Sequence, residues 1–415
     1  MDSRPTRWLT ASVSATIDRP APAETTTEAV VARLDAATSA FDAPFAAVDL
    51  PTLDANAADL VRRASGTPIR VASKSVRARA VLERALGAGL TESGGFRGIM
   101  AYSLREALWL VEKGARDVLM GYPTVDRAAL ADLASDADAR QAITLMVDCA
   151  EHLDVIAAAG ATGARLCLDV DASLRIGPVH LGVRRSPLRT PDAAATLARV
   201  AASRAFKVVG VMFYEAQIAG LPDSSAAVRL VKKASASELS TRRGAVVDAV
   251  TSVVGRLEIV NSGGTGSLEV SSADPAVTEV TAGSGLFVPT LFDRYRAFTP
   301  RPAMFFALDA VRRPTPKIAT LFSGGYIASG PAGASRVPTP VWPAGLKLLR
   351  NEGAGEVQTP VTGLAASALR IGDRVWFRHA KAGELCERFT TVHLVDAGGA
   401  VTTVPTYRGE GQCFG

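Results

Sequence analysis

Cysteine and histidine are scarce in this 415-residue sequence, which limits the disulfide and metal chemistry open to it. The four cysteines show no Cys-x-x-Cys spacing and form no even framework within a small domain, so we expect no disulfides. Cys149 and Cys167 lie beside or within apolar runs, where a free cysteine behaves as a small hydrophobic residue. With only four histidines, a site built from several histidines is not expected.

Long apolar stretches and concentrated basic stretches are also missing. No run reaches the roughly 18–20 apolar residues that cross a bilayer, and residues 1–20 lack the apolar core of a signal peptide. We therefore expect a cytoplasmic protein without a membrane partner. The net charge of +5 comes from scattered arginines, whereas nucleic-acid binding favours a basic stripe with interleaved aromatics. We expect no nucleic-acid partner either.

What the sequence does contain is a repeated pattern of short apolar runs followed by helical stretches. Near-continuous apolar runs are typical of parallel strands buried on both faces, and their alternation with helices indicates βαβ units. Eight runs over some 250 residues predict a (β/α)8 barrel, with a doubly wound open sheet as the alternative. The runs occupy residues 45–49, 69–73, 98–102, 117–121, 143–148, 165–171, 208–214 and 257–261.

Proline and glycine become frequent after about residue 300, and short strand-like runs at 372–378 and 388–395 replace the helices. We expect a barrel domain over residues 40–299 and a β-rich C-terminal domain over residues 300–415. The N-terminal segment, residues 1–39, is expected to pack with that second domain, and its alternating residues 7–17 fit a further strand there.

Lys74 directly follows the apolar run 69–73, at the end of a predicted barrel strand. Chemistry in such barrels gathers at the carboxyl ends of the strands. A lysine desolvated there would have a lowered pKa, which suits it to attack carbonyl groups. The alternative is a lysine that extends from the strand end into solvent.

A glycine-rich segment follows the last of the eight runs. Backbone N–H groups and hydroxyls in such a loop can hold a phosphate, and barrel phosphate sites often use the loops after the last strands. In a closed barrel this loop would be a neighbour of Lys74. The candidate phosphate ligands are Ser262, Gly263, Gly264, Thr265 and Gly266.

Three further residues at strand ends could contact a bound anion or ring. Tyr214 ends the run 208–214, where its other role would be core packing. Arg175 and Arg184 flank the segment after the run 165–171, and either could pair with a phenolate or carboxylate. The sequence does not choose between these two arginines.

The second domain holds a dense set of reactive side chains between its two predicted strands. His379, Lys381, Glu384 and Cys386 lie within eight residues of one another. His379 with Glu384 or Cys386 could hold a divalent metal such as zinc. The alternative is a polar hairpin with an incidental buried cysteine.

These features together resemble the D-threonine aldolase and D-serine dehydratase group of alanine-racemase-like enzymes that use pyridoxal 5'-phosphate (PLP). The resemblance covers roughly residues 40–400 and rests on the order of several segments. They are Phe41–Pro44 leading into Ala47–Leu50, Val71–Lys74, Val118–Pro123, Gly263–Gly266, and Thr278–Gly283 followed by Leu286–Phe287. It implies a PLP barrel with a C-terminal β-domain, a homodimer, Lys74 as the internal aldimine and the Gly263–Ser267 segment as the phosphate loop.

One position departs from the family pattern. Members with aldolase or dehydratase activity have a metal-binding His-x-Cys or His-x-Asp pair, whereas His379 here is followed two residues later by Lys381. Either Glu384 or Cys386 replaces the second ligand, or Lys381 supplies the positive charge instead of zinc or manganese. We expect a lyase that acts on D-β-hydroxy amino acids through an external aldimine, with His379, Lys381 or Glu384 acting near the β-hydroxyl.

Two other functions remain open at this stage. A PLP-dependent racemase would need a base on the opposite face of the cofactor, for which Tyr326 and Tyr407 are the candidates. A non-catalytic PLP-binding protein is less favoured, because such proteins usually lack a second domain.

Overall fold

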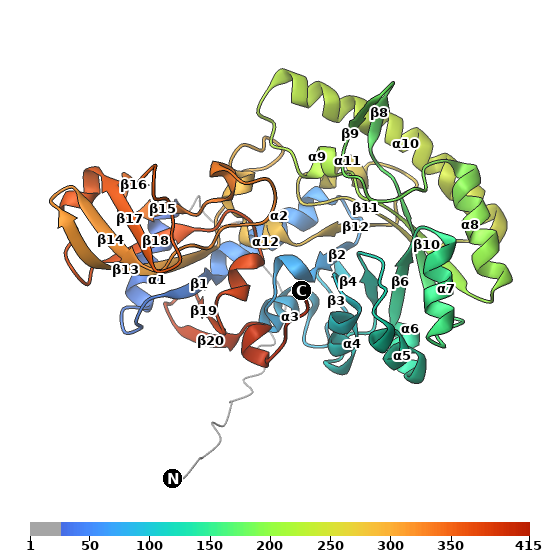
Figure 1. Cartoon of the computed structure of the whole chain (residues 1–415), viewed down its shortest axis with the longest axis horizontal. Coiled ribbons are helices and arrows are strands. Elements are labelled where there is room, and N and C mark those ends of the chain that lie inside the picture. The colour runs from blue at the N-terminus through green and yellow to red at the C-terminus, as the bar shows by residue number, and fades with distance from the viewer. Residues whose placement is uncertain (1–25) are drawn as a thin grey trace, which may run out of the picture.

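Most of the apolar runs form the strands of a closed parallel barrel in the computed structural model, which describes residues 26–415. The barrel lies on the right in Figure 1, and the ring closes because the first barrel strand pairs with both the second and the eighth. The eight strands are β2 (Ile69–Ala72), β4 (Phe96–Ala101), β5 (Val118–Met120), β6 (Ile143–Val147), β7 (Arg165–Val170), β10 (Lys207–Phe213), β11 (Ile259–Ser262) and β12 (Glu279–Ala282). The prediction of a barrel is confirmed.

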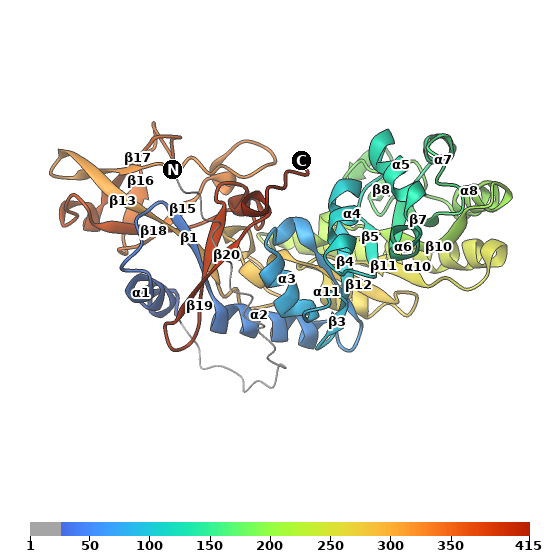
Figure 2. The ribbon, with the colours of Figure 1, turned by 90° about the horizontal axis from the view of Figure 1, so that it is seen from below.

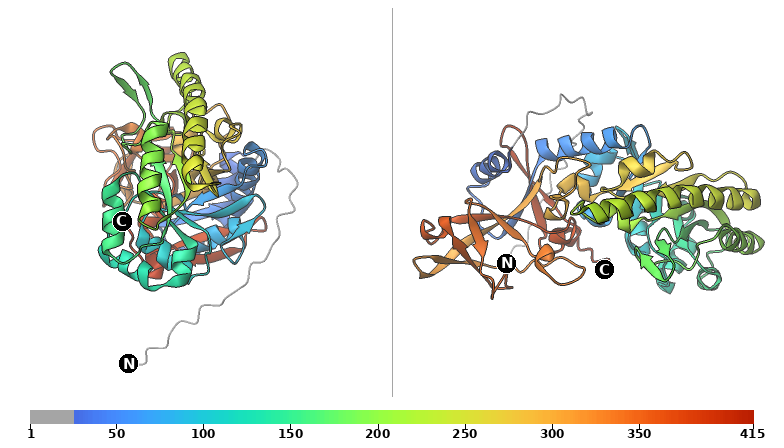
Figure 3. Two further views of the ribbon diagram at one scale, coloured as in Figure 1. Left: turned by 90° about the vertical axis from the view of Figure 1, so that its right-hand side faces the viewer. Right: turned by 90° about the horizontal axis from the view of Figure 1, so that it is seen from above.

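Helices follow the strands and cover the outside of the barrel, as the end-on view in Figure 3 shows. Several begin at a side chain that accepts a backbone N–H bond, such as Ser103 before α4 and Asp126 before α5. The helices are α2 (Leu50–Arg63), α3 (Arg79–Leu86), α4 (Leu104–Glu112), α5 (Arg127–Ser135), α6 (Ala137–Ala142), α7 (Ala150–Ala158), α8 (Pro191–Ser203), α9 (Ala216–Ala219), α10 (Ala226–Val254), α11 (Leu268–Ser272) and α12 (Ser284–Phe287). A short strand, β3 (Glu92–Ser93), pairs with β4, and the hairpin β8 (Leu174–Ile176) and β9 (Val179–Leu181) projects beside α10 (Figure 1).

The first apolar run is not a barrel strand, and this corrects the count of strands. Residues 45–49 form β1 (Phe45–Asp49), which pairs antiparallel with β13 and parallel with β19 in the second domain. The eighth barrel strand is β12 instead, so the glycine loop follows the seventh strand and Tyr214 follows the sixth. The pattern misled because α1 (Thr27–Ala37) covers β1 and makes it as fully buried as a barrel strand.

The second domain is a nine-stranded sheet, on the left in Figure 1, and Figure 2 shows β1, in blue, among its orange and red strands. Its other strands are β13 (Met304–Thr315), β14 (Ile318–Phe322), β15 (Thr339–Trp342), β16 (Leu346–Leu348), β17 (Gln358–Gly363), β18 (Arg374–Arg378), β19 (Thr391–Val395) and β20 (Val401–Pro405). The C-terminal β-rich domain is therefore confirmed. The further strand expected at residues 7–17 lies outside the described residues. None of the helices in residues 26–415 is long and apolar enough to cross a membrane.

A buried ionic network links the barrel strands near their amino ends. Arg70 donates to both carboxylate oxygens of Glu279 at 2.7 Å and to those of Asp117 at 2.7 and 3.2 Å. Asn261 donates to the same Glu279 carboxylate at 2.7 Å. Arg70 and Glu279 are each 1% exposed, so the ion pair between them is the main interaction that replaces the hydration each charge loses on burial.

We expect Arg70→Met to destabilise the fold by about 3–5 kcal/mol, because Glu279 would stay buried without its charge partner. The measurement is the free energy of unfolding in urea. Arg97→Met is the matched control, because Arg97 reaches the same carboxylate only at 3.9 Å and is 42% exposed; its loss should cost below about 1 kcal/mol. Equal small losses in both variants would contradict the role given to Arg70.

Candidate active site

A cavity of about 470 Å³ opens at the carboxyl ends of the barrel strands, where the second domain closes one side of it. Its walls combine loops from most of the barrel with one loop and one turn of the second domain. The polar and glycine residues of interest in the lining are Lys74, Arg77, Tyr102, Tyr122, Arg185, Tyr214, Gly263, Gly264, Thr265, Gly283, Ser284, Ser329, Lys381 and Glu384. The position agrees with the place where barrel enzymes keep their chemistry.

Lys74 lies in the short helix η1 (Ser73–Ser75) directly after β2, with its side chain open to the cavity. Ser73 fixes this turn by donating to the Met100 carbonyl at 3.0 Å. The surrounding walls desolvate the amine and lower the pKa of Lys74, and the cationic side chains of Lys381 and Arg185 lower it further. A larger fraction of this amine is therefore neutral near pH 7 than in an ordinary lysine.

The second domain contacts Lys74 through its backbone as well as through charge. Gly383 has a φ of +86°, and a Cβ at this position would lie 1.9 Å from the Lys74 carbonyl oxygen. Only glycine allows the turn that carries Lys381 and Glu384 to approach so closely.

The glycine loop after β11 is shaped from behind by Glu215. This buried carboxylate accepts from Ser262 Oγ and Ser267 Oγ at 2.9 Å each, from Gly263 N at 3.3 Å and from Ser271 Oγ. Because the Ser262 hydroxyl donates to the Glu215 carboxylate, it does not line the cavity. The front of the loop then presents Gly263, Gly264 and Thr265 to the cavity.

Two of the five predicted loop residues therefore do not line the cavity. Ser262 is fully buried and also accepts from Arg243 at 2.8 Å. Gly266 packs under the loop, where a Cβ would lie 2.3 Å from the ring of Tyr295. Both support the loop from behind.

A second glycine turn completes this side of the cavity, and the sequence did not single it out as a site. Gly283 and Ser284 follow β12, and a Cβ on Gly283 would lie 2.5 Å from the Ala72 carbonyl oxygen. The Thr265 hydroxyl lies 3.3 Å from that of Ser284 and accepts from Gly285 N at 3.0 Å. A glycine–serine pair after an apolar run could have indicated this turn, but the predicted strands do not include residues 279–282.

Arg77 and Arg185 both line the cavity, whereas neither predicted arginine does. Arg185 donates to Asp169 at 2.9 Å and to the Gly121 carbonyl at 2.7 Å, and it lies over the rings of Tyr122 and Tyr214. Burial raises the pKa of Asp169 to about 6 even with this arginine beside it. Tyr214 also lines the cavity, and its contact with a cofactor stays a prediction.

The two predicted arginines lie in a separate depression on the outer side of Arg185. Arg175 donates to Asp171 at 2.6 Å, and Arg184 is exposed. Sequence reasoning missed Arg185 because neighbours in an extended segment point to opposite sides, and nothing local indicates which of the pair turns inward.

The predicted second-domain cluster is divided by the fold. Lys381 and Glu384 line the cavity, whereas His379 is 2% exposed and Cys386 is 1% exposed, and neither is in the lining. Burial lowers the pKa of His379 to about 3 and raises the pKa of Cys386 to about 12. Neither nitrogen of the His379 ring has a hydrogen-bond partner within the described residues.

These residues do not fit a metal site of the family type. Among residues 26–415, His379, Glu384 and Cys386 are not brought together as a three-ligand group. Glu384 instead accepts from Ser329 N at 2.9 Å, and Lys381 donates to Ser329 Oγ at 3.0 Å and to its carbonyl at 3.2 Å. The ammonium of Lys381 occupies the position in the motif where a ligand was expected.

Neither tyrosine considered as a racemase base lines the cavity of this chain. Tyr326 lies 2.9 Å from Ser323 Oγ and packs on Phe306. Tyr407 is 1% exposed and packs against Trp109.

We expect Gly264→Ala to weaken PLP binding by about tenfold, because a Cβ there would lie 2.7 Å from the Ala219 Cβ and would displace the loop; tenfold corresponds to about 1.4 kcal/mol. Titration of the apoprotein with PLP measures the change. Gly244→Ala is the matched control, because Gly244 lies in α10 with nothing within 4 Å of the added Cβ. Equal affinities in the two variants would argue against a phosphate at this loop.

Comparison with known proteins identifies the class of this fold and site. The model of the alanine racemase N-terminal domain matches residues 48–289, more than half of the chain. The chain therefore belongs to the alanine racemase N-terminal domain family, and this membership implies PLP as the cofactor. No curated protein matches the sequence.

Solved structures with the same two-domain fold include several activities. D-threonine aldolase from Filomicrobium marinum is 21% identical with a TM-score of 0.72, and the match covers 89% of this chain and 95% of that one. D-threo-3-hydroxyaspartate dehydratase from Delftia sp. is 18% identical with a TM-score of 0.68, covering 88% and 97%. Alanine racemase from Corynebacterium glutamicum is 15% identical with a TM-score of 0.54, covering 81% and 90%. At these identities the similarity shows the fold alone.

Proposed function

We propose that this chain is a PLP-dependent lyase acting on D-β-hydroxy amino acids, as a D-threonine aldolase or a D-serine/D-threonine dehydratase. The observation that carries the proposal is the ammonium group of Lys381, which the second domain presents to the same cavity as Lys74. A lyase of this kind needs one amine that binds the cofactor and a separate polar group at the substrate β-oxygen.

The lining residues fit PLP. Lys74 offers an amine of lowered pKa, and the turns at Gly263–Thr265 and Gly283–Ser284 offer backbone N–H groups and hydroxyls to a phosphate. The glycines are needed there, since a Cβ on Gly264 or Gly283 would overlap neighbouring atoms. When bound, PLP supplies an electron sink for bond cleavage at the substrate α-carbon.

We infer that Lys381 stabilises negative charge on the substrate β-oxygen. Its ammonium is held by Ser329, and Glu384 in turn binds the Ser329 amide, so the charge has a defined position. That charge would favour either loss of the hydroxyl proton before cleavage or departure of the hydroxyl group. Among the described residues that line the cavity, the carboxylate is that of Glu384, and we assign the proton transfer to it.

The alternative functions have less support. Within one chain, Tyr326 and Tyr407 both lie outside the cavity lining, so a racemase would need a base from elsewhere. A non-catalytic PLP-binding protein would not need charged side chains from a second domain. The homodimer and the cytoplasmic location stay predictions. Light scattering of the purified protein tests the homodimer.

The deciding experiment is an assay of purified protein with D-threonine and D-serine, using the L-enantiomers as controls. Glycine with acetaldehyde indicates an aldolase, and 2-oxobutyrate or pyruvate with ammonia indicates a dehydratase. We expect activity to survive EDTA, because Lys381 stands where a metal ligand would be needed. Interconversion of alanine enantiomers without turnover of any D-hydroxy amino acid would overturn the lyase and favour the racemase.

A further inference from the structure

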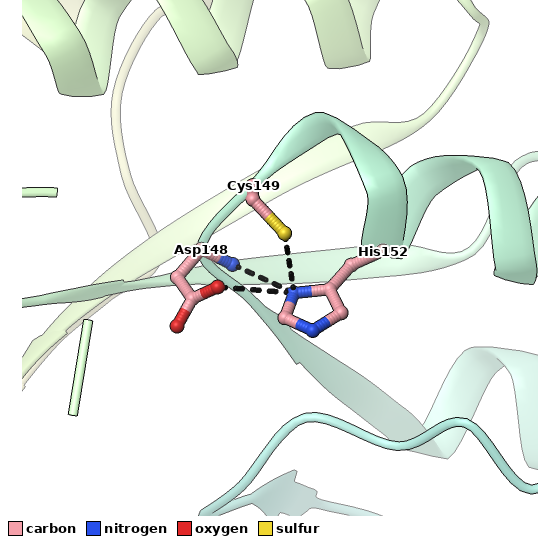
Figure 4. A group of neighbouring side chains, drawn as sticks. All are labelled: Asp148, Cys149 and His152. Carbon is pink, nitrogen blue, oxygen red and sulfur yellow. Dashed lines mark hydrogen bonds and ion pairs between the residues drawn. The ribbon is translucent and has the colours of Figure 1, made fainter. Parts of the chain in front are cut away.

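Three metal-ligating side chains of different kinds meet at the end of barrel strand β6, outside the cavity (Figure 4). The His152 Nδ1 atom lies 3.1 Å from the Asp148 Oδ1 atom and 3.4 Å from the Cys149 Sγ atom. All three ligand atoms lie within 4.8 Å of one another, and this is the one such group within residues 26–415. It is distinct from His379, Glu384 and Cys386 of the second domain.

Three polar atoms surround the Nδ1 atom of His152. The backbone N–H of Asp148 also points at His152 Nδ1, at 3.3 Å. If this nitrogen carries no proton, its single lone pair faces that N–H, the thiol and a carboxylate oxygen that can only accept. If it is protonated, it can donate to the Asp148 carboxylate, but it then has no lone pair for the N–H of Asp148. A cation in the place of that proton would bind the nitrogen, the sulfur and the carboxylate oxygen together.

Two of the three separations between ligand atoms are close to those around one tetrahedral ion, and the third is within 4.8 Å. With zinc bonds of about 2.0–2.1 Å to nitrogen and oxygen and about 2.3 Å to sulfur, tetrahedral edges are about 3.3–3.6 Å. The two measured separations, 3.1 and 3.4 Å, are within a few tenths of an ångström of these edges. Small rotations of the side chains would open them to the required values.

The backbone holds the group at a rigid junction. Asp148 follows β6, Cys149 is the N-cap residue of α7, and His152 lies one turn into that helix. Cys149 accepts no capping bond from the helix, so its sulfur is not used for capping and faces His152 instead. Asp148 is 7% exposed, whereas the other two are half-buried, so the group is open to solvent on one side.

We propose that Asp148, Cys149 and His152 form a binding site for a divalent cation of borderline softness, with zinc as the type ion. One nitrogen, one sulfur and one carboxylate oxygen are a ligand set that such ions accept. Water, or the exposed carboxylate of Glu151, which interacts with the same thiol, takes the fourth position. Binding releases the thiol proton. The site is independent of the proposed lyase activity.

The test is zinc content of the purified holoenzyme after equilibration with zinc and removal of free ion. We expect one zinc per chain in the wild type, in Cys413→Ser and in Cys386→Ala. Cys149→Ser and His152→Asn should bind zinc at least about 100-fold more weakly, since loss of a residue that only hydrogen-bonds to a metal ligand already lowers metal affinity by about 10–100-fold. X-ray absorption at the zinc edge should show one sulfur at about 2.3 Å.

Cys413 is the matched control, because it is an exposed free cysteine away from the group. In the Cys413→Ser background, zinc should slow modification of Cys149 by a thiol reagent, a readout that does not depend on whether Cys149→Ser folds. No zinc in the wild type would overturn the proposal. So would unchanged binding in Cys149→Ser and His152→Asn, or loss of zinc only in Cys386→Ala, which would place the metal in the second domain.

Discussion

Lys74→Ala should lower turnover of D-β-hydroxy amino acids by roughly 10³-fold or more, because it removes the amine to which we assign the covalent bond with the cofactor. The variant should also lose the PLP adduct that borohydride reduction fixes on the wild-type protein. The fold should remain, since the side chain opens into the cavity and supports no packing of its own. Mass spectrometry of peptides after reduction locates the adduct.

Lys347→Ala is the control for this prediction, because Lys347 is an exposed lysine on β16 of the second domain. It should keep full activity and the adduct on Lys74. A reducible adduct that persists in Lys74→Ala would place the cofactor on another lysine and would overturn the assignment of the whole cavity.

Lys381→Ala should lower kcat by about 10²–10³-fold, the loss that follows removal of one group stabilising developing negative charge. The PLP adduct on Lys74 should be retained, which separates this variant from Lys74→Ala. Activity of the wild type should be insensitive to EDTA in the same assay. If Lys381→Ala keeps its kcat and EDTA abolishes activity, a metal and not Lys381 acts at the β-oxygen.

A second readout tests whether Lys381 acts on Lys74 through charge. The Lys381 ammonium lowers the pKa of Lys74, because it disfavours a second positive charge in the cavity. Removing it should therefore raise the pKa of Lys74. The rate of PLP binding to the apoprotein rises with pH as Lys74 loses its proton, and this acid limb of the pH profile should move to higher pH. Lys347→Ala should leave this limb in place. An unchanged limb in Lys381→Ala would mean that the two amines do not interact.

The candidate site shows which kinds of residue a sequence can predict. Lys74 and the glycine loop were predicted because both follow apolar runs directly, and chain order places strand ends at one end of a barrel. Arg185, Ser284 and the turn at Gly383 were missed, because their position depends on how loops fold back over the cavity. His379 was predicted to act, but the fold buries it behind the lining.

The strand count failed for a related reason. The run at residues 45–49 has the same apolar pattern as a barrel strand, and both kinds are buried on two faces. Burial on two faces follows from what covers a strand, and the pattern does not record which element that is. In this protein α1 covers β1, so the strand joins the sheet of the second domain.

The sequence by itself determined the barrel, the β-rich second domain and the position of Lys74 at a strand end, because these follow from local periodicity and from the order of elements along the chain. Only the tertiary structure decided that Lys381 and Glu384, and not His379, face Lys74. The same is true of Arg185 rather than Arg184. The choice between neighbouring residues depends on the direction in which a loop side chain points, and that direction is set by contacts between segments far apart in the sequence. Asp148, Cys149 and His152 lie within five residues of one another, but only the turn from β6 into α7 brings their ligand atoms together.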